Sequence, residues 1–475
     1  MSRINTNIPS IQAVHKLAAN QSDLNIRLER LSTGLRINRG RDDPAGLIAS
    51  ETLRSEIRGI SQAIDNSTRA INVISTAEGA LNEISALLLD VRGLINHAAN
   101  EGANSQEELQ ADQLQIDSLL EAIDRIANTT QFGGEKLING NLGYSTSGLT
   151  TTEIATATVF GARVPDNAST SVVVEVTTVA ETAGVVYAAS GLSAANVTIE
   201  LRGNKGTEII SMAGSSSAAQ IATSVNNNIA TTGVSAFVSG VGAAAVVLLN
   251  STTYGSDAFV SVKPIDGWFI AATGVATEDT GVDAGVLING QTASTQGLTT
   301  SLRANGLDVE MQLTAAFGTA LGTSNFAITG GGATFQIGPE VNANGQVDIG
   351  VPSVATSNLG NSVVGFLNTI KGAGSNSVIG GNCQAAEDIL VEAISQVAVI
   401  RGRLGGLQRN QIETNINSQR VALENVQAAE SAIRDADIAV EVAALTRAQI
   451  LVQSTTSILG VANSLPQNAL SLLGG

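Results

Sequence analysis

Positive charge, aromatic side chains and cysteine are all scarce in this chain of 475 residues. It holds 25 Lys and Arg against 42 Asp and Glu, a net charge of −17 at pH 7. A nucleic-acid partner calls for a basic face, so none is expected. With one cysteine, Cys383, no intramolecular disulfide framework can form. Aromatic residues make up only 3%, so the apolar mass is Ala, Val, Ile and Leu.

The sequence also lacks long apolar runs. The longest, VGAAAVVLL at 241–249, is about half of what a membrane span needs, so no membrane span is expected. The first ten residues, MSRINTNIPS, contain no continuous apolar segment of the kind that a secretory signal peptide carries. If the protein leaves the cell, we expect it to use a different route.

Residue patterns for catalysis are missing too. The two histidines, His15 and His97, lie far apart on segments of helical character, and no HExxH occurs. The glycine-rich stretch TGGGATF at 329–335 lacks the Lys-Ser/Thr of a phosphate-binding loop, so we expect a turn there. The sequence therefore predicts no enzyme, no cofactor and no metal site.

Proline and aromatic residues divide the chain into two ends and a middle. No proline occurs between Pro44 and Pro165 or between Pro352 and Pro466, which permits long unbroken helices. Only Phe132 among the aromatic residues precedes Tyr144, and none follows Phe366. The ends resemble each other in composition, and the middle looks inserted between them.

The ends carry apolar residues in alternating steps of three and four, which is typical of helices packed along a seam. We predict helices over 45–100 and 384–435, roughly 84 and 78 Å long at 1.5 Å per residue, and a shorter one from Leu109 to Ile126. The seams are Val14, Leu17, Leu24, Leu28, Leu31, Leu35; then Ile57, Ile60, Ile64, Ile71, Ile74, Leu81, Leu88, Ile95; then Ile389, Ile394, Val397, Ile400, Leu404, Leu407, Ile412, Ile416, Leu423, Val426, Ile433.

The middle has the β-branched segments and turn residues of strands. One helix signal with serine caps interrupts it at 215–233. The predicted strands are 170–179, 196–203, 207–212, 245–250, 258–263, 307–313 and 333–338. The fold class is therefore α+β and multidomain, with a helical core from both ends and an inserted, mainly β domain.

A charged joint, GRDDPAGL at 40–47, follows the first seam. Gly34 and Gly40 loosen that seam, Asp42 and Asp43 stand where a helix N-cap is needed, and Pro44 suits a first helical turn. The stretch thus predicts a helix stop followed by a restart, which separates a terminal coiled-coil segment from the long helix.

Several stretches together resemble the terminal signatures of bacterial flagellin. At the N-terminal end they are INTN at 4–7, RLSTGLRIN at 30–38, DDPAGL at 42–47 and TTQFGG at 129–134; at the C-terminal end they are RDADIAVEVAALTRAQIL at 434–451 and ANSLPQNALSLL at 462–473. The likeness covers about 1–143 and 383–475. Gly133 departs from the Asn usual in the family, but leaves a turn in place. Within the middle, 198–238 resembles an insertion motif of flagellins and hook-associated proteins.

The resemblance implies a structural subunit that polymerises into a helical tube used for motility, secreted to the bacterial flagellum. It implies three domains: a terminal coiled-coil inner core of 1–43 with 436–475, an α-helical rod of 44–143 with 383–435, and a variable, surface-exposed, mainly β domain of 144–382, in one or two subdomains. The joint would be the spoke between core and rod.

The resemblance also implies contacts and partners. Partners would be other copies, the filament cap and hook-associated junction proteins, the type III export apparatus, and an export chaperone at about 435–475. The residues expected at subunit interfaces are Leu17, Leu24, Leu28, Leu31, Leu35, Arg36, Arg39, Arg41, Asp42, Asp43, Ile438, Leu445, Ile450 and Leu459.

Two alternatives stay open from the sequence: a hook–filament junction protein with similar ends, and a minor flagellin that displays a binding domain. The resemblance further implies an innate-receptor contact on the rod, at Leu88, Asp90, Arg92 and Leu94. Asp90 and Gly93 stand where many flagellins have arginine and glutamate, so weak receptor activation is expected.

Overall fold

The computed structural model describes residues 6–100, 102–164, 168–188, 196–240, 245–267, 277–304 and 306–473. By its internal contacts the chain divides into two units. The first comprises 1–69, 336–346 and 409–475, and the second comprises 70–335 and 347–408.

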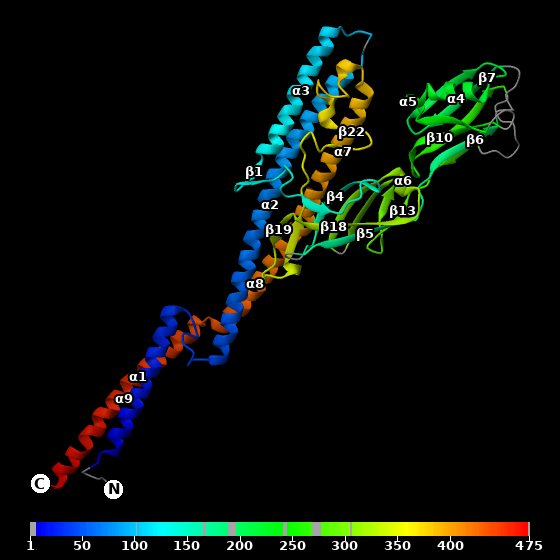
Figure 1. Ribbon diagram of the computed structural model, residues 1–475. Coiled ribbons are helices and arrows are strands. Elements are labelled where there is room, and N and C mark those ends of the chain that lie inside the picture. The colour runs from blue at the N-terminus through cyan, green and yellow to red at the C-terminus, as the bar shows by residue number, and fades with distance from the viewer. Residues whose placement is uncertain are drawn as a thin grey trace. The chain divides into compact units, whose positions relative to one another are not determined.

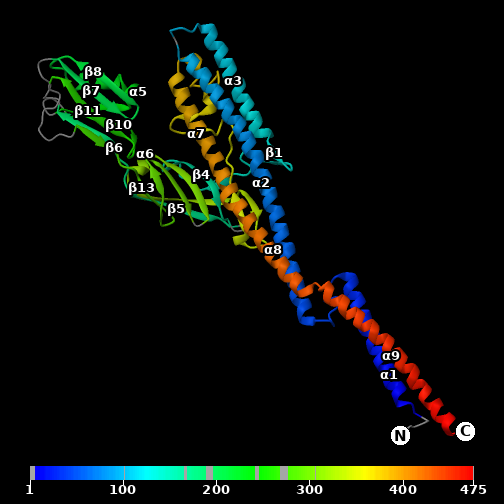
Figure 2. The same cartoon turned by 180° about the vertical axis from the view of Figure 1, so that it is seen from behind.

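The first unit contains an antiparallel pair of helices, α1 (Ile8–Thr33) and α9 (Ile438–Leu473), which lie side by side in Figures 1 and 2. The Asn7 side chain caps α1 by accepting from Ser10 N at 3.1 Å and donates to Ala462 O at 2.7 Å. Gly34 ends the helix with φ 71°, a conformation that glycine adopts without strain. The remaining helices of this unit are the first part of α2 (Pro44–Ala98) and α8 (Thr414–Arg434).

The second unit contains the rest of α2, with α3 (Gln106–Thr129) and α7 (Cys383–Leu407). Ser105 and Glu108 form a capping box at the start of α3. The predicted helices over 45–100 and 109–126 are confirmed. The predicted helix over 384–435 is helical throughout, but a π-helical turn, Gln408–Glu413, separates α7 from α8. Cys383 begins α7 and is buried.

From Ile60 onward, the buried residues of α2 form one row with steps of three and four. Five of them, Ile60, Ile74, Leu81, Leu88 and Ile95, belong to the predicted seam. The row is Ile60, Ala63, Ser67, Ala70, Ile74, Ala77, Leu81, Ile84, Leu88, Val91, Ile95 and Ala98. Alternating Ala and larger residues along such a row let neighbouring helices approach closely, so α2 presents a narrow, continuous packing face.

The middle of the chain is mainly β, as predicted. One pair of sheets has the strand orders β14-β13-β5-β18-β3 and β15-β16-β17-β4; a second pair has β6-β10-β9 and β12-β11-β7-β8. Their bounds are β3 Tyr144–Ser147, β4 Ile154–Ala162, β5 Thr170–Thr178, β6 Thr182–Ala188, β7 Val197–Gly203, β8 Gly206–Met212, β9 Val234–Ser239, β10 Val246–Tyr254, β11 Phe259–Asp266, β12 Glu278–Thr280, β13 Gly285–Ile288, β14 Gln291–Thr292, β15 Ser294–Gln296, β16 Thr299–Ala304, β17 Leu307–Leu313 and β18 Gly322–Gly331.

Each pair of sheets encloses its own cluster of buried apolar residues. One contains Val174, Val286 and Met311, and the other contains Val185, Leu201 and Val247. The predicted helix at 215–233 is α4 (Ala218–Asn226) followed by α5 (Ile229–Thr232), and α4 packs into the second cluster. A short helix, α6 (Ala315–Gly318), follows β17.

Smaller strand pairs complete the second unit and its border. The hairpin of β1 (Gln131–Phe132) and β2 (Glu135–Lys136) turns at Gly133 and Gly134, whose φ angles are 61° and 95°. Both positions favour glycine, so the turn expected in TTQFGG is confirmed. The other pairs are β19 (Ala333–Gln336) with β20 (Gln346–Ile349), and β21 (Gly360–Asn361) with β22 (Gly365–Phe366).

The segment after β20 lies against helices and not in the large sheets. Gln113 of α3 donates to Ile370 O at 2.9 Å and accepts from Val378 N at 3.0 Å. Asp124 of α3 accepts from Thr356 N at 2.8 Å. Residues 356–378 therefore belong structurally with the helices, although the sequence analysis assigned them to the inserted domain.

Candidate subunit interface

The contact between α1 and α9 uses one row of residues on each helix. On each helix, one row of buried or partly buried residues recurs in steps of three and four, which is the spacing of a heptad seam. On α1 they are Ala13, Leu17, Asn20, Leu24, Arg27 and Leu31; on α9 they are Glu441, Leu445, Ala448, Val452, Thr455, Leu459 and Ala462. Five predicted interface residues, Leu17, Leu24, Leu31, Leu445 and Leu459, lie on these two rows.

Other residues of the first predicted seam and of the predicted subunit interface lie outside this contact. Val14 and Leu28 are 49% and 46% exposed, and Ile438 and Ile450 are 52% and 61% exposed. The reason is geometric, because residues 14, 21 and 28 follow a different line on the helix from 17, 24 and 31. The first seam therefore combines two rows, and α9 covers only one of them.

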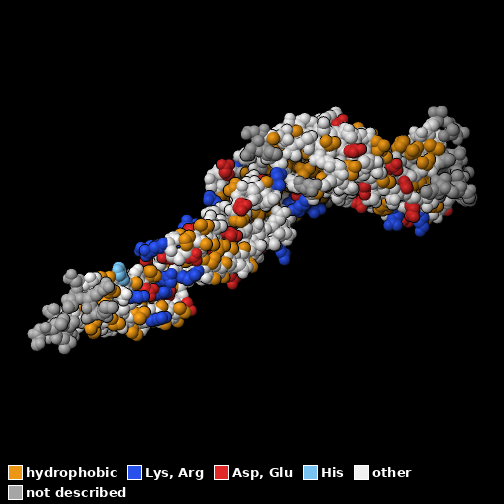
Figure 3. All heavy atoms as spheres, turned by 90° about the horizontal axis from the view of Figure 1, so that it is seen from below, with side chains coloured by type: hydrophobic (Ala, Val, Ile, Leu, Met, Phe, Trp, Pro, Cys, Tyr) orange, Lys and Arg blue, Asp and Glu red, His pale blue; other side chains and the backbone are white. Residues whose placement is uncertain are grey.

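Helix α9 is apolar on the sides that do not contact α1. Its 36 residues include only two charged ones, Glu441 and Arg447. The eight large apolar side chains that the described part of α9 exposes are Ile438, Val440, Val442, Ile450, Leu451, Ile458, Val461 and Leu465. Figure 3 shows hydrophobic side chains on the surface at this helical end. A helix with so few charges and so many exposed large apolar side chains is normally covered by other protein.

A nearly buried carboxylate on α9 forms ion pairs with two arginines of α1. Glu441 is 6% exposed and receives Arg27 Nη1 at 3.1 Å and Arg30 Nη1 at 3.1 Å. Burial by itself would raise the pKa of Glu441, but hydrogen bonds from the two arginines outweigh it and lower that pKa below 4.5. Heptad spacing alone does not predict this cluster. The scarcity of charge on α9 is the signal that could have pointed to Glu441.

Replacing Glu441 with glutamine is expected to destabilise the α1–α9 pair by about 1.5–3 kcal/mol, because two arginines lose a charged acceptor. Since the folded-state pKa is lowered, this contribution is present above pH 4.5 and is lost as the pH falls through the folded value. Urea unfolding followed by circular dichroism at neutral and acidic pH measures both effects.

The matched control is Asp23→Asn, which removes an exposed partner of Arg27 at 3.2 Å. Its expected effect is below about 1 kcal/mol. Equal losses from the two substitutions, or a Glu441→Gln loss that persists unchanged in acid, would contradict a dominant role for the buried carboxylate.

The joint after α1 is held by backbone contacts to the segment before α9. Leu35 pairs with Asp435 in an isolated antiparallel bridge. Arg36 N donates to Arg434 O at 2.7 Å, and its Nε donates to Ile433 O at 3.2 Å. The charged side chain of Arg36 therefore has a partner within the chain.

Of the two aspartates expected to cap α2, Asp43 does so, whereas Asp42 binds the loop that precedes it. Asp43 Oδ1 accepts from Gly46 N at 2.9 Å and begins α2, as predicted. Asp42 Oδ2 accepts from Arg39 N at 2.9 Å and from Asn38 N at 3.2 Å. The bond from Arg39 N is the largest cause of the lowered pKa of Asp42.

Two arginines of the joint, Arg39 and Arg41, are exposed to solvent. The Arg39 and Arg41 side chains are 59% and 64% exposed. Arg39 contacts Glu29 at 3.0 Å, and Arg41 lies 3.7 Å from Asp42. Both side chains therefore have surface left for another molecule.

The predicted receptor stretch on α2 is only partly accessible. Leu88 is fully buried, so including it as a receptor contact was wrong for the folded chain. Asp90 is exposed, Leu94 is partly buried, and Arg92 pairs with Glu387 of α7 at 2.8 Å. The accessible part is therefore Asp90, Gly93 and the exposed face of Arg92.

No metal-binding group of three or more His, Cys, Asp and Glu side chains occurs in the described part of the chain. His97 instead pairs with Asp112 at 2.7 Å, a hydrogen bond that raises the pKa of the imidazole. None of the described helices is both long and apolar enough to cross a lipid bilayer.

Both ends of the chain match a known protein family. Residues 4–142 match the family described as bacterial flagellin N-terminal helical region, and residues 388–473 match the bacterial flagellin C-terminal helical region. A crystal structure of flagellar hook-associated protein 3 from Legionella pneumophila covers 80% of this chain and 97% of that chain at 13% identity, with a TM-score of 0.30. That score is too low to compare the folds.

Two flagellins can be aligned with this chain along almost the whole length of both sequences. Flagellin A of Vibrio anguillarum is 31% identical over 470 residues, covering 99% of each chain. A flagellin of Salmonella muenchen is 30% identical over 520 residues, again covering 99% of each. With helical regions of this family at both ends and relatives of this identity along its whole length, the chain belongs to the bacterial flagellins, the structural subunits of the extracellular flagellar filament.

Proposed function

We propose that α1 and α9, within residues 1–43 and 436–475, form the inner core of the filament by packing against the same helices of neighbouring copies. The observation that carries this proposal is the nearly uncharged α9, with apolar side chains exposed on the sides that α1 leaves open. Each such Leu or Ile stabilises an interface by about 1.5–3 kcal/mol once it is buried. A repeating contact between different faces of identical chains builds a filament.

The two rows of the first seam then have separate roles. Leu17, Leu24 and Leu31 hold α1 to α9 within one chain, while Val14 and Leu28 meet neighbouring chains. The joint at 34–43 connects this core to the rod. Because the Arg39 and Arg41 side chains are 59% and 64% exposed, we assign these two charged residues of the joint to contacts between copies.

We further propose that the inserted, solvent-facing domain begins and ends at the pairing of β3 with β18. In this pair Ser147 lies opposite Ala327 and Tyr144 opposite Gly331. Residues 44–143 and 383–435 form the rod, joined by the segment at 356–378 that bonds to α3. The inserted domain thus comprises fewer residues than the range 144–382 expected from the sequence.

Excising the inserted domain tests this assignment. A chain in which Asn-Gly replaces 148–326 closes β3 and β18 with a two-residue turn that suits paired strands. It is expected to polymerise with a critical concentration within about tenfold of the parent, or roughly 1.4 kcal/mol. Sedimentation and electron microscopy measure this. A chain that keeps its helical circular dichroism but forms no filaments would show that the outer domain holds the polymer together.

The export chaperone and the filament cap and junction proteins are assigned to the same helices, α1 and α9. The apolar side chains of α9 need cover before assembly, which supports an export chaperone at 435–475 and passage through the flagellar type III export apparatus. The filament cap and junction proteins would meet the same helices at the ends of the polymer. We assign no catalytic role to the chain.

Recognition by the innate receptor for flagellin is expected to be weak. An acidic receptor surface would repel Asp90, which stands where many flagellins have arginine. The substitutions Asp90→Arg and Gly93→Glu restore the usual charges at exposed positions, and a side chain at Gly93 meets nothing within 4 Å. A reporter-cell titration is expected to show stronger activation by the double variant, while Asn82→Arg on the same helix leaves it unchanged. Strong activation by the parent, unaltered by the double variant, would contradict this.

A further inference from the structure

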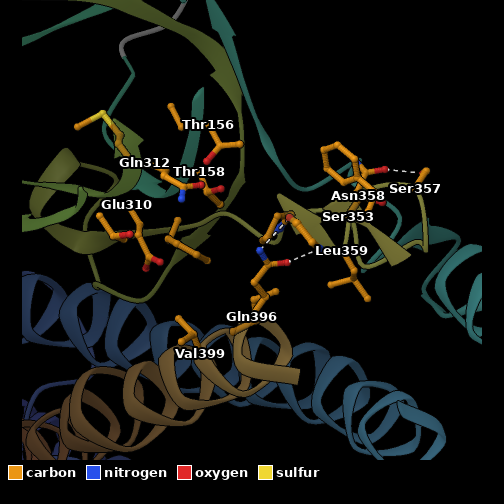
Figure 4. A pocket seen from close by; sticks show the side chains of 18 residues that line it. Thr156, Thr158, Glu310, Gln312, Ser353, Ser357, Asn358, Leu359, Gln396 and Val399 are labelled. Carbon is orange, nitrogen blue, oxygen red and sulfur yellow. Dashed lines mark hydrogen bonds between the residues drawn. The ribbon is translucent and has the colours of Figure 1, made fainter. Parts of the chain in front are cut away.

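A polar cleft of about 420 Å³ lies between a β-sheet and helix α7 within the second unit (Figure 4). Strands β4, β16 and β17 form one wall, and α7 forms the facing wall. The segment 352–360 closes one end. The volume falls in the range of small-molecule sites, which are concave and combine apolar surface with a few polar groups.

The sheet wall is a grid of polar side chains set by strand pairing. Thr156 of β4 pairs with Gln312 of β17, which pairs with Thr299 of β16. Thr158 and Glu310 form the next row. Because residues two apart on a strand share a face, these five side chains project together toward α7, as Figure 4 shows for the four that it labels.

Most of this grid lacks hydrogen-bond partners. In the part of the chain that the structure describes, the side chains of Thr156, Thr158, Thr299 and Gln312 make no hydrogen bond to protein. Glu310 differs, since its carboxylate receives Arg403 Nη2 at 2.9 Å. The grid thus offers hydroxyl and amide groups that can both donate and accept hydrogen bonds. They lie next to the Glu310 carboxylate, whose charge Arg403 neutralises.

The facing wall supplies apolar surface and one fixed amide. Val399 of α7 is 36% exposed, and Leu359 borders the end of the cleft. Gln396 of α7 is held by Gly360, whose N donates to it at 2.9 Å and whose O accepts from it at 3.0 Å. The guanidinium of Arg403 lies 3.9 Å from the centre of the Phe160 ring, which fixes the charged edge of the site.

We propose that this cleft binds a single neutral sugar ring, as a free hexose or as the terminal unit of a glycan. The hydroxyl groups of such a ring both donate and accept, which matches the unpartnered threonines and Gln312. Its C–H face matches Val399. An acidic sugar would not find an available cation here, because Arg403 is already paired with Glu310 and Asp308.

The test uses the full-length monomeric chain and saturation-transfer difference NMR. The probes are glucose, galactose, mannose, N-acetylglucosamine and their disaccharides, each at about 10 mM, a concentration suited to weak binding. At least one probe is expected to receive saturation. Gln312→Leu is expected to weaken its binding by about tenfold through the loss of hydrogen bonds, and Val399→Trp is expected to abolish it by filling the cleft.

The control is Thr323→Val, an exposed β18 residue of the other sheet with no side-chain hydrogen bond, which should leave binding unchanged. Circular dichroism checks that each variant is folded; because Val399 projects from an exposed helix face, Val399→Trp keeps the test valid if Gln312→Leu unfolds the sheet. Binding of none of the probes, binding unaffected by both variants, or tighter binding of glucuronic acid than of glucose would each overturn the proposal.

Discussion

Replacing Leu28 or Ile450 with aspartate is expected to abolish filament growth while the single chain stays folded. Both side chains are exposed in one chain, at 46% and 61%, so a charge there costs the monomer little. In the assembled core each would be buried among apolar helices, where an unpaired charge costs several kcal/mol. Since 1.4 kcal/mol corresponds to a factor of ten, the critical concentration should rise by about 100-fold or more.

Two further substitutions distinguish assembly from folding. Asn25→Asp introduces the same charge at an exposed polar position of α1 and should leave filaments intact. Leu24→Asp places the charge on the row that faces α9, so it should lower the stability of the monomer as well. Sedimentation measures the critical concentration, and urea unfolding measures stability. If Leu28→Asp and Asn25→Asp assemble equally well, the exposed row does not meet neighbouring chains.

Removing residues 440–475 is expected to have a still larger effect. The truncated chain loses nearly all of α9, with Glu441 and the partner row for α1. We expect no filaments even when the concentration exceeds the parent's critical value by about 1,000-fold, roughly 4 kcal/mol. The second unit, which contains none of the deleted residues, should remain folded.

When the truncated protein is purified from the cytoplasm, its assembly can be measured independently of its export. Seeds of parent filament should not elongate with the truncated chain, and light scattering follows this directly. Thermal unfolding of the sheets should match that of the parent, which serves as the internal control. Long filaments from the truncated chain would remove α9 from the core and contradict the proposed assembly.

Much of the helical architecture could be predicted because heptad spacing is local. The larger members of the α2 row, such as Ile74 and Leu81, were visible in the sequence. Their alternate partners Ala63, Ala70 and Ala77 were not, since a buried alanine looks like any other alanine. On α1 the sequence could not separate Leu24 from Leu28, because only the position of α9 decides which row is covered.

The β region was predicted best where β-branched residues are dense, as in β5 and β17. Strands β4 and β18 were missed because Gly, Thr, Asn and Ala weaken their pattern. The polar cleft could not be predicted at all. It depends on Thr156 facing Gln312 across two strands that are distant in sequence, and on α7 from the far end of the chain.

Cysteine labelling in monomer and filament tests the central claim most directly, since Cys383 is the only native cysteine and is buried. In a Cys383→Ser background, Ile450→Cys should react rapidly with a maleimide in the monomer. Its labelling should fall by about 100-fold in filaments if burial there is worth roughly 3 kcal/mol. Leu321→Cys, in the inserted domain and 69% exposed, should react equally in both states. Labelling at residue 450 that stays equally fast in filaments would contradict an inner core built from the exposed face of α9.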